Sequence, residues 1–400
     1  MKEGWKCKKL GELAISMADG PFGSNLKKEH YTNRKEVRII QLSNIGEEGW
    51  RDENTKYTTY EHLETIKRSE VVSGDIVIAK MMPAGRAILC PDKESKYVLS
   101  SDAVRVTLKE SLSNRFILYS INSPSFRKQV YENVSGSGRV RTSLRKLRDC
   151  KIFVPPLSEQ QAIVSRLDSA FAKIDAVKAN AEKQLNDAKA LFQKELSKAM
   201  TPKEGWEEKK LSDIGETQTG ATPSKNDKSN YGDFIPFIRP TEINYDGLGN
   251  INYKSEMSFS EKGLENGRLF KGGSIFMVCI GATISKVAIS TKDVSCNQQI
   301  NVITPRSNIN AKFVFHAMTS NAFKNKVLKE GMSAQATLPI ISKGKWEKLT
   351  IPIPPLSEQQ AIVTHLDTLS EKLKTVEEKQ KAVMAECDAM KQALLREVFA

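Results

Sequence analysis

The sequence of 400 residues predicts an α+β protein in which two similar mixed α/β globular domains are joined by two long antiparallel coiled-coil helices, with pseudo-two-fold symmetry. Two repeats predict this fold. The decapeptide PPLSEQQAIV occupies residues 155–164 and recurs 199 positions later at 354–363. The related stretches KEGWKCKKLGELA at 2–14 and KEGWEEKKLSDIG at 203–215 each open a large segment. A repeat of this length indicates that one structural plan is used twice.

The repeats divide the chain into four predicted segments. Two globular domains are expected at residues 1–154 and 202–353, and two helical segments at residues 155–201 and 354–400. The two large segments diverge between their landmarks, although GDIVIAK at 74–80 lies opposite GSIFMVC at 273–279. We therefore expect a shared architecture that presents two different surfaces.

The globular segments contain short β-branched runs bounded by Gly, Pro and Asn, a pattern typical of strands. The predicted strands are residues 37–42, 76–80, 104–108 and 152–154 in the first segment and residues 274–279, 300–304 and 349–353 in the second. Amphipathic periodicity predicts helices at 115–131 and 311–329. The order of the strands does not follow from these patterns.

The decapeptide has the features of a helix start. Its two prolines end the preceding strand, Ser158 is a suitable N-cap, and Gln161 would complete a capping box. Glu159 places a negative charge near the positive end of the helix dipole. The second copy repeats this arrangement with Ser357, Gln360 and Glu358. Pro202 is expected to end the first helix.

An apolar heptad pattern continues through both helical segments. The predicted coiled-coil seam consists of Ile163, Leu167, Ile174, Val177 and Leu191 in the first helix and Ile362, Leu366, Leu369, Leu373, Val376, Val383 and Leu394 in the second. A helix of about 43 residues is about 64 Å long and would leave this stripe in water, so the two seams are expected to pack antiparallel. Gln184 and Gln380 fall within the pattern and either fix the register or turn to solvent at its edge.

The net charge of +13 lies mainly on the globular segments. Residues 1–154 contain 28 Lys and Arg against 19 Asp and Glu, and residues 201–353 contain 20 against 15. The two helical segments are nearly neutral, with 7 against 6 in residues 155–200 and 6 against 8 in residues 354–400. A polyanionic partner for the globular segments is the simplest explanation, and a generally basic solvated surface is the alternative.

Composition excludes several other classes of protein. No apolar run approaches the roughly 18 residues of a membrane span, and the first residues lack the apolar stretch of a secretory signal, so a cytoplasmic location is expected. The six cysteines form no C-x-x-C pair and are expected to be reduced core residues. No metal or cofactor site is expected, because the four histidines have no ligand spacing and no phosphate-binding glycine loop is present.

A rigid rod that carries two different basic domains fits a protein that reads two separated DNA half-sites. Side chains that read DNA bases or contact phosphates are then expected on loops of the two globular domains. Gln41 and Asn44 lie at the end of a predicted strand and could each read adenine, whereas the loop SGSGRVRTSLRK suits approach to phosphates. The candidate DNA-binding residues are Gln41, Asn44, Lys80, Arg86, Arg139, Arg141, Arg145, Lys146, Arg239, Thr241, Asn244, Lys286, Gln298, Gln335 and Lys343. For each one, the alternative is an ordinary solvated loop residue.

Across its whole length the sequence resembles the specificity subunit of type I restriction–modification systems. The resemblance rests on paired motifs: GW at 4–5 and 205–206, DGPFGSNL at 19–26, GDI at 74–76, and both P-P-L-x-E-Q blocks. It implies a non-catalytic subunit of a bacterial defence system whose two target-recognition domains each read one half of a bipartite, asymmetric double-stranded DNA site. The helices would set the spacer and dock two DNA methyltransferase subunits, joined by restriction/translocase subunits. S-adenosylmethionine, Mg²⁺ and ATP are then expected on the partners, with no cofactor on this chain.

Two other classes of function compete with this interpretation. A nuclease would use Asp75 with Glu94-x-Lys96, but these last two residues fall in an expected turn and the second half has no counterpart. A purely structural scaffold with two domains would show no affinity for duplex DNA at low salt.

Overall fold

The computed structural model describes residues 4–132, 141–244, 249–254, 257–332 and 338–400. The chain forms two compact units. The N-terminal unit comprises residues 1–181 and 382–400, and the C-terminal unit comprises residues 182–381. Each unit therefore combines one globular domain with parts of both long helices, and the four sequence segments remain a prediction.

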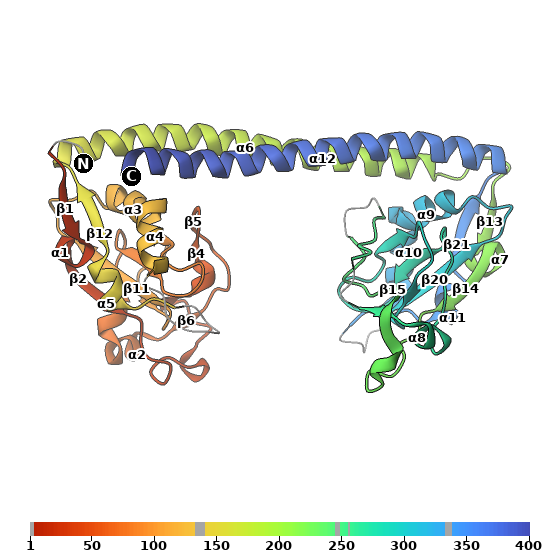
Figure 1. Cartoon of the computed structure of the whole chain (residues 1–400), viewed down its shortest axis with the longest axis horizontal. Helices are drawn as coiled ribbons and strands as arrows, with labels where there is room; N and C mark the ends of the chain where they lie inside the picture. The colour runs from red at the N-terminus through yellow and green to blue at the C-terminus, as the bar shows by residue number, and fades with distance from the viewer. Residues whose placement is uncertain (1–3, 133–140, 245–248, 255–256, 333–337) are drawn as a thin grey trace. The chain divides into compact units, whose positions relative to one another are not determined.

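In its described residues, the N-terminal unit contains two four-stranded sheets and two two-stranded ones (Figure 1). Of the two larger sheets, the first is antiparallel in the order β2-β11-β8-β9, and the second has the order β6-β3-β10-β7. The strands are β1 (Lys6–Lys9), β2 (Ala14–Asp19), β3 (Val37–Ile40), β4 (Ile45–Gly46), β5 (Gly49–Trp50), β6 (Tyr57–Thr58), β7 (Glu70–Val71), β8 (Ile76–Ala79), β9 (Ala87–Leu89), β10 (Tyr97–Leu99), β11 (Ala103–Leu108) and β12 (Lys151–Val154). The helices are α1 (Leu10–Leu13), α2 (Tyr60–Thr65), α3 (Asn114–Asn122), α4 (Pro124–Glu132) and α5 (Leu144–Asp149), with 3₁₀ turns η1 (Lys28–His30), η2 (Leu42–Asn44) and η3 (Lys67–Ser69).

The C-terminal unit repeats the same plan, with sheets in the orders β14-β20-β17-β18 and β16-β15-β19. Its strands are β13 (Glu207–Lys210), β14 (Gly215–Thr219), β15 (Tyr231–Ile238), β16 (Ser258–Phe259), β17 (Ile275–Val278), β18 (Val287–Ile289), β19 (Ser295–Cys296), β20 (Ile300–Pro305) and β21 (Thr350–Ile353). The helices are α7 (Leu211–Ile214), α8 (Glu261–Glu265), α9 (Ala311–Thr319), α10 (Asn321–Gly331) and α11 (Lys343–Trp346), with the turn η4 (Lys228–Asn230). In each unit a two-stranded antiparallel pair, β1–β12 or β13–β21, connects the domain to the start of a long helix, α6 (Leu157–Ala199) or α12 (Leu356–Phe399).

The predicted strands are confirmed with small shifts of their ends, but each predicted amphipathic helix is two helices. Ser123 separates α3 from α4, and Ser320 separates α9 from α10. Each serine is the C-cap of the first helix, and its hydroxyl accepts the N–H of Phe126 or Phe323 in the second helix. One residue thus ends one helix and starts the next, which periodicity alone could not reveal.

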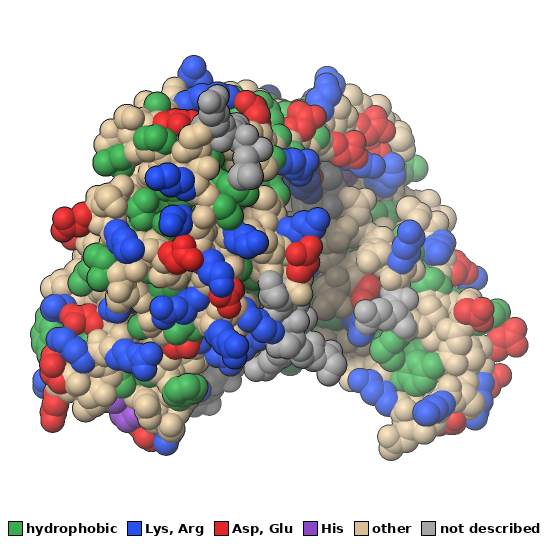
Figure 2. Space-filling model, turned by 60° about the vertical axis from the view of Figure 1, so that its left-hand side comes forward, with side chains coloured by type: hydrophobic (Ala, Val, Ile, Leu, Met, Phe, Trp, Pro, Cys, Tyr) green, Lys and Arg blue, Asp and Glu red, His purple; other side chains and the backbone are tan. Residues whose placement is uncertain are grey.

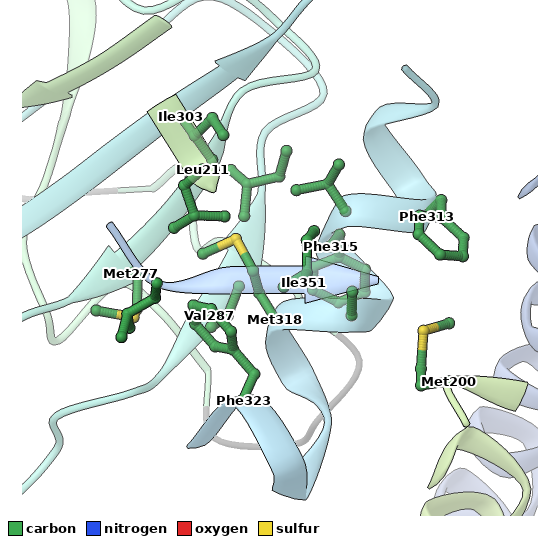
Figure 3. Packing of buried hydrophobic residues seen from close by; sticks show 14 of the residues in the cluster. Met200, Leu211, Met277, Val287, Ile303, Phe313, Phe315, Met318, Phe323 and Ile351 are labelled. Atoms are coloured by element: carbon green, nitrogen blue, oxygen red, sulfur yellow. The ribbon is translucent and has the colours of Figure 1, made fainter. Parts of the chain in front are cut away.

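The core of each unit forms between the antiparallel sheet, the helix pair and one end of each long helix. In the C-terminal unit, Phe313, Phe315 and Met318 of α9 pack against Ile351 of β21 and the sheet (Figure 3). Leu196 near the end of α6 and Met200 directly after it belong to the same cluster, which buries them almost completely. In the N-terminal unit the end of α12 contributes Leu395, Val398 and Phe399 in the same way.

Within each unit the two long helices run antiparallel, as predicted. In the N-terminal unit Arg166 pairs with Glu397 at 2.7 Å and Lys178 pairs with Asp388 at 2.8 Å. In the C-terminal unit a 2.9 Å hydrogen bond joins Gln380 Nε2 to Gln184 Oε1. Gln184 is exposed, so the two amides meet at the edge of the seam. They are bonded to each other, as residues that fix the register would be, and they also face solvent. The approximate two-fold relation between the units stays a prediction.

The predicted seam is confirmed in part. Leu167, Ile174, Ile362, Leu366 and Leu373 are buried, and Ile163, Leu369, Val376, Val383 and Leu394 are half-buried. Val177 and Leu191 were predicted wrongly, because their exposed fractions are 52% and 59%. The buried positions of α6 continue instead through Ala181, Leu185, Phe192 and Leu196. An α-helix drifts about 20° per heptad, so a straight helix moves a strict seven-residue pattern off the contact line.

The predicted N-caps are also wrong. The helices α6 and α12 begin at Leu157 and Leu356, which places Ser158 and Ser357 in the first turn, where both are exposed. The carbonyl of Pro156 accepts the N–H of Gln160 at 3.0 Å. The decapeptide therefore repeats for a reason other than capping.

The reason is a junction between helix and domain that recurs in both units. Gln160, 1% exposed, donates from Nε2 to the carbonyl of Pro155 at 2.9 Å and accepts the N–H of Ser113, the N-cap of α3, at 3.0 Å. The preceding Glu159 accepts the indole N–H of Trp5 at 2.9 Å. Since an unpaired buried amide costs free energy, this geometry fixes the angle between α6 and its domain.

The C-terminal unit contains the same junction. Gln359 joins the carbonyl of Pro354 to the N–H of Asn310, both at 2.9 Å, and Glu358 accepts from Trp206 at 3.0 Å.

A second junction differs between the units. Asp168 of α6 accepts from Tyr119 and Arg115, whereas Asp367 of α12 accepts from His316 Nε2 at 3.3 Å and from Lys312. Burial lowers the pKa of His316, although Asp367 opposes this shift. The imidazole is therefore neutral at neutral pH.

Two further predictions, on the cysteines and on membrane-spanning segments, can be compared with the structure. All six cysteines are free and all except Cys7 are buried. Burial raises the pKa of the Cys90 thiol to about 12, which makes it a poor nucleophile. Among the described residues, no helix has both the length and the apolar character needed to cross a bilayer.

Replacing Leu167 should test which positions hold the helices together. Leu167→Ala is expected to lower the free energy of unfolding by about 3 kcal/mol, because Leu167 is fully buried in the core of the N-terminal unit. Val177→Ala, at an exposed seam position, should change it by less than about 0.5 kcal/mol. Urea denaturation followed by circular dichroism measures both free energies of unfolding. An equal loss in the two variants would mean that Val177 is also covered, as the strict heptad pattern predicted.

Candidate nucleic-acid interface

Several strands of the N-terminal unit end together at one edge of its sheets. Gly20 donates its N–H to Ala103 at 3.0 Å, and Lys80 donates its backbone N–H to Asp102 at 2.8 Å. A Cβ on Gly20 would lie 1.8 Å from the carbonyl oxygen of Ser100, so only glycine allows this close approach. We call the residues that follow these strand ends the strand-end surface; in this unit they are Gly20, Gln41, Lys80, Ser100 and Arg141.

Two loops that the sequence marked separately meet at this surface. Met81 and Arg141 form an antiparallel β-bridge, and Thr142 donates its N–H to the carbonyl of Lys80 at 2.9 Å. The start of the loop KMMPAGR therefore lies beside Arg141 and Thr142 of the second loop. Arg139 lies outside the described residues.

The C-terminal unit repeats the same backbone contacts. Gly220 donates to Ile300 at 3.0 Å, Cys279 donates to Gln299 at 2.9 Å, and Ile341 donates to Cys279 at 2.9 Å. A Cβ on Gly220 would lie 2.3 Å from a backbone oxygen of the 297 turn, as at Gly20. The strand-end surface of this unit therefore consists of Gly220, Arg239, Cys279, Asn297 and Ile340.

Although the backbone is repeated, the side chains differ. The position of Lys80 holds Cys279, the position of Arg141 is matched by Ile340, which bridges to Ile280, and the position of Gln41 holds Arg239. Two equal frames with unlike side chains can select unlike ligands. Loop residues on a rigid scaffold commonly carry recognition in this way.

Lys80 and Arg141 are both paired with acids. Lys80 is buried and its Nζ lies 2.6 Å from Asp19, whereas Arg141 is exposed and lies 3.3 Å from Asp102. Lys80 was predicted as a DNA contact, but its ammonium group is used internally to hold the loop after β2. Arg141 keeps the exposure that a DNA contact needs.

Asn44 and Arg86 were also predicted as contacts, and the structure gives both internal roles. Asn44 has no exposed surface, and its Nδ2 donates to the carbonyls of Arg51 at 3.0 Å and Glu53 at 2.6 Å. Its Oδ1 accepts the N–H of Gln41 at 2.8 Å. Arg86 Nη2 donates to the carbonyl of Leu42 at 3.0 Å, and burial lowers its pKa. Both side chains shape the turn that presents Gln41.

The remaining candidates of the N-terminal unit lie on α5 and near β3. Arg145 is exposed and Lys146 is half-buried. Gln41 is half-buried, and its Oε1 is enclosed without a hydrogen-bond partner among the described residues. An unpaired buried amide oxygen leaves this side chain with a reason to reorient when a ligand offers a donor.

In the C-terminal unit most candidates form contacts within the chain. Arg239 pairs with Glu242 at 2.7 Å, and Thr241 donates to Glu242 at 3.0 Å. Lys286 Nζ lies 3.5 Å from the carbonyl of Ile243, and Asn244 is exposed.

Two further candidates have partners of their own. Gln298 accepts the hydroxyl of Thr222 at 2.6 Å, and Lys343 pairs with Glu347 at 2.7 Å on α11. Gln335 lies outside the described residues. None of these contacts tests whether a residue binds DNA, so the exposed candidates stay predictions.

Sequence reasoning missed Glu242 and Phe22. Glu242 is buried and stands three residues after Arg239, the spacing that separates Gln41 from Asn44. This shared three-residue spacing is the sequence signal that could have predicted a structural partner for Arg239. Phe22 is 80% exposed in the loop that follows Gly20, and the signal for it was its place in the motif DGPFGSNL.

The nuclease-like residues do not converge. Asp75 accepts the backbone N–H of Val72 at 3.0 Å, Glu94 accepts the hydroxyl of Tyr57 at 2.7 Å, and Lys96 pairs with Glu70 at 2.7 Å. Each of the three therefore belongs to a different internal contact. In the part of the chain that the structure describes, no cluster of three or more His, Cys, Asp or Glu side chains could hold a metal ion.

Charge alone does not locate a binding surface. Figure 2 shows Lys and Arg side chains spread over the visible face with Asp and Glu between them. Long-range attraction to a polyanion is compatible with this distribution, but selection among DNA sequences also requires contacts to base edges.

Comparison with known proteins gives consistent results. The family model described as type I restriction modification DNA specificity domain matches residues 2–187 and again residues 203–384. The type I restriction enzyme EcoBI specificity subunit of Escherichia coli is 23% identical over 96% of this chain and 84% of that protein. The type I restriction enzyme MjaIX specificity subunit of Methanocaldococcus jannaschii is 31% identical over 43% of this chain, which corresponds to 39% of that protein.

A solved structure supports the fold. A chain from a study of complex assembly and conformational transition of the type I R-M system has a TM-score of 0.72 and 18% identity, covering 99% of this chain and 97% of that one.

Asn44→Ala separates the structural role from a DNA-reading role. Removing the amide leaves one N–H and two carbonyls without their partner, so the free energy of unfolding should fall by about 2 kcal/mol or more. Arg141→Ala, which removes an exposed ion pair, should change it by less than about 1 kcal/mol. Urea denaturation compares the two variants; an Asn44→Ala protein of unchanged stability but altered DNA preference would contradict the internal role.

Proposed function

Because this chain belongs to the family of type I restriction modification DNA specificity domains, we propose that each of its two globular domains reads one half of a bipartite, asymmetric double-stranded DNA site. The family is one of recognition subunits, so the chain recognises DNA and is not the catalytic component. One observation supports the proposal most directly: the two units repeat the same backbone contacts at their strand ends but place different side chains there. A site read by two unlike surfaces is not palindromic.

The paired helices would set the number of unread base pairs between the two half-sites. Their antiparallel contacts within each unit, together with the buried glutamine junctions, support a rigid connection to each domain. Half-site spacing is a geometric property of the protein that holds the two readers.

The helices would also dock two DNA methyltransferase subunits, with restriction/translocase subunits joining them. Val177, Leu191 and Met390 support this part, because all three are more than half exposed on helices and exposed apolar side chains there are suited to a protein partner. S-adenosylmethionine, Mg²⁺ and ATP would then be bound by the partner subunits, and the complex would act in the cytoplasm.

Exchanging one domain tests the proposal. Residues 1–154 are replaced by the corresponding domain of a relative, and the chain is co-expressed with its methyltransferase subunit. Modified adenines mapped by long-read sequencing should show one new half-site and one unchanged half-site. A motif that changes in both halves, or in neither, would contradict independent reading by the two domains.

Shortening the helices tests the spacer. Deleting residues 179–185 of α6 together with residues 379–385 of α12 removes one heptad from each and keeps the helical phase nearly unchanged. The loss of about 10 Å should shorten the gap by about three base pairs and leave the bases of both half-sites intact. The same sequencing measures the gap; altered bases with an unaltered gap would exclude the spacer role.

A further inference from the structure

The hairpin of β4 and β5 extends from the N-terminal domain toward the two long helices of its unit (Figure 1). Its base is fixed in the domain, because Ile45 is 1% exposed and Trp50 packs against the same core. The buried amide of Asn44 also donates to the carbonyl of Arg51, directly after β5. Because the base is held in this way, a contact at the tip, residues 47–48, bears on the orientation of the whole domain.

The tip carries two glutamates that face different elements. Glu48 Oε1 lies 2.5 Å from Lys178 Nζ of α6, and the same ammonium group lies 2.8 Å from Asp388 Oδ1 of α12. Glu47 pairs with Arg127 of α4 at 2.8 Å. One lysine therefore joins the hairpin to both long helices.

The position and charge of Lys178 suit this contact. Its side chain is 19% exposed, and the bonds to Asp388 and Glu48 raise its pKa, so it is charged at neutral pH. An ammonium group donates three N–H groups and can serve both carboxylates at once. Single exposed ion pairs contribute little to stability, whereas a network of several charges contributes more.

The hairpin crosses a hollow between the domain and the helices. A cavity of about 910 Å³ lies there, and its lining includes Trp50, Leu118, Phe171 and Leu395. Because this space is open, the tip meets the helices through Lys178 and not through a continuous apolar core. The orientation of the domain along this stretch therefore depends on the ion pairs at the tip.

Contacts with the N-terminal domain follow one another along α6 at Gln160, Asp168 and Lys178. Residues 160 to 178 span about 27 Å of helix at 1.5 Å per residue. The first two contacts lie near the start of the helix and leave the domain free to tilt about them. A third contact farther along the helix restricts that tilt.

The C-terminal unit uses the equivalent helix position differently. Glu377 stands 199 residues after Lys178, pairs with Lys381 of the same helix at 2.8 Å and lies 3.8 Å from Lys189 of α6. The position that holds a hairpin in one unit thus connects the helices with each other in the other unit.

We propose that Lys178 and Glu48 form a latch between the N-terminal domain and the long helices, and that this latch fixes the gap at which the domain reads its half-site. Both are positioning residues, which act through the orientation of the domain and not by contact with DNA. The inference rests on the proposed function, in which the helices set the spacing, and adds a contact that keeps this spacing to a single value.

The latch itself is tested on the full chain without DNA. A carbodiimide condenses a carboxylate with an amine in contact with it, and mass spectrometry identifies the joined residues. A link between Glu48 and Lys178 is expected in the wild-type protein. Lys178→Arg should remove the link but keep the ion pairs, because a guanidinium group is not coupled. A wild-type protein without this link would overturn the latch.

Charge reversal tests the role of the latch in spacing. Glu48→Lys places two ammonium groups against each other and should release the hairpin. Adding Lys178→Glu and Asp388→Lys restores both ion pairs with opposite signs. Asp92→Lys is the matched control, because Asp92 is exposed in a turn of the same domain and its replacement changes the net charge equally.

Each variant is co-expressed with the methyltransferase subunit, and the assembled complex is bound to duplexes whose gap is cognate, one base pair shorter or one base pair longer. The preference for the cognate gap should fall about two- to fivefold in Glu48→Lys and recover in the triple variant. Long-read sequencing should show unchanged bases in both half-sites and additional gap lengths. Asp92→Lys and Lys178→Arg should keep the wild-type preference.

Three results would overturn the positioning role: an unchanged gap preference in a folded Glu48→Lys protein, a folded triple variant as permissive as Glu48→Lys, or altered bases in the half-site of the N-terminal domain. If the link forms but the gap preference does not respond, the proposed function stands and this inference falls. If the wild-type complex modifies sites without two separated halves, the proposed function falls.

Discussion

The buried amide of the P-P-L-x-E-Q block is the contact on which the architecture depends. Gln160 and Gln359 each join a proline carbonyl at the end of a strand to the first N–H of a domain helix. Both amides are 1% exposed, so neither can exchange its partners for water without cost. The neighbouring glutamates hold Trp5 and Trp206, which pack edge-on against Phe116 and Phe313. In each unit, these contacts fix the direction of the long helix that starts there, α6 or α12, relative to the domain that precedes it.

A second set of repeated contacts lies at the strand ends of the two units. Gly20 and Gly220 bring loops so close to the next turn that a side chain would not fit, and the repeated backbone bonds place equivalent residues at equivalent points. The backbone bonds of the two frames are the same, whereas the side chains at the positions of Gln41 and Arg239 differ.

The second junction shows how far the two units have diverged within the same frame. Asp168 meets a tyrosine and an arginine, and Asp367 meets a buried histidine and a lysine. His316 Nδ1 is buried without a hydrogen-bond partner in the described part of the chain, so protonating this ring would add a second buried donor. Since the pKa of His316 is lowered in the folded state, its contribution to stability is present above the ordinary histidine pKa and is lost as pH falls.

The sequence by itself determined the repeat, the positions of most strands, the two long helices and their antiparallel pairing, because these follow from local periodicity and from the need to bury an apolar stripe. Only the tertiary structure decided which seam positions are covered, since helix drift exposes Val177 and Leu191. It likewise decided that Asn44, Lys80 and Arg86 serve the frame while Gln41 and Arg239 stand at matching points. Burial and hydrogen-bond partners arise from residues far apart in the chain, and a pattern along one sequence does not contain them.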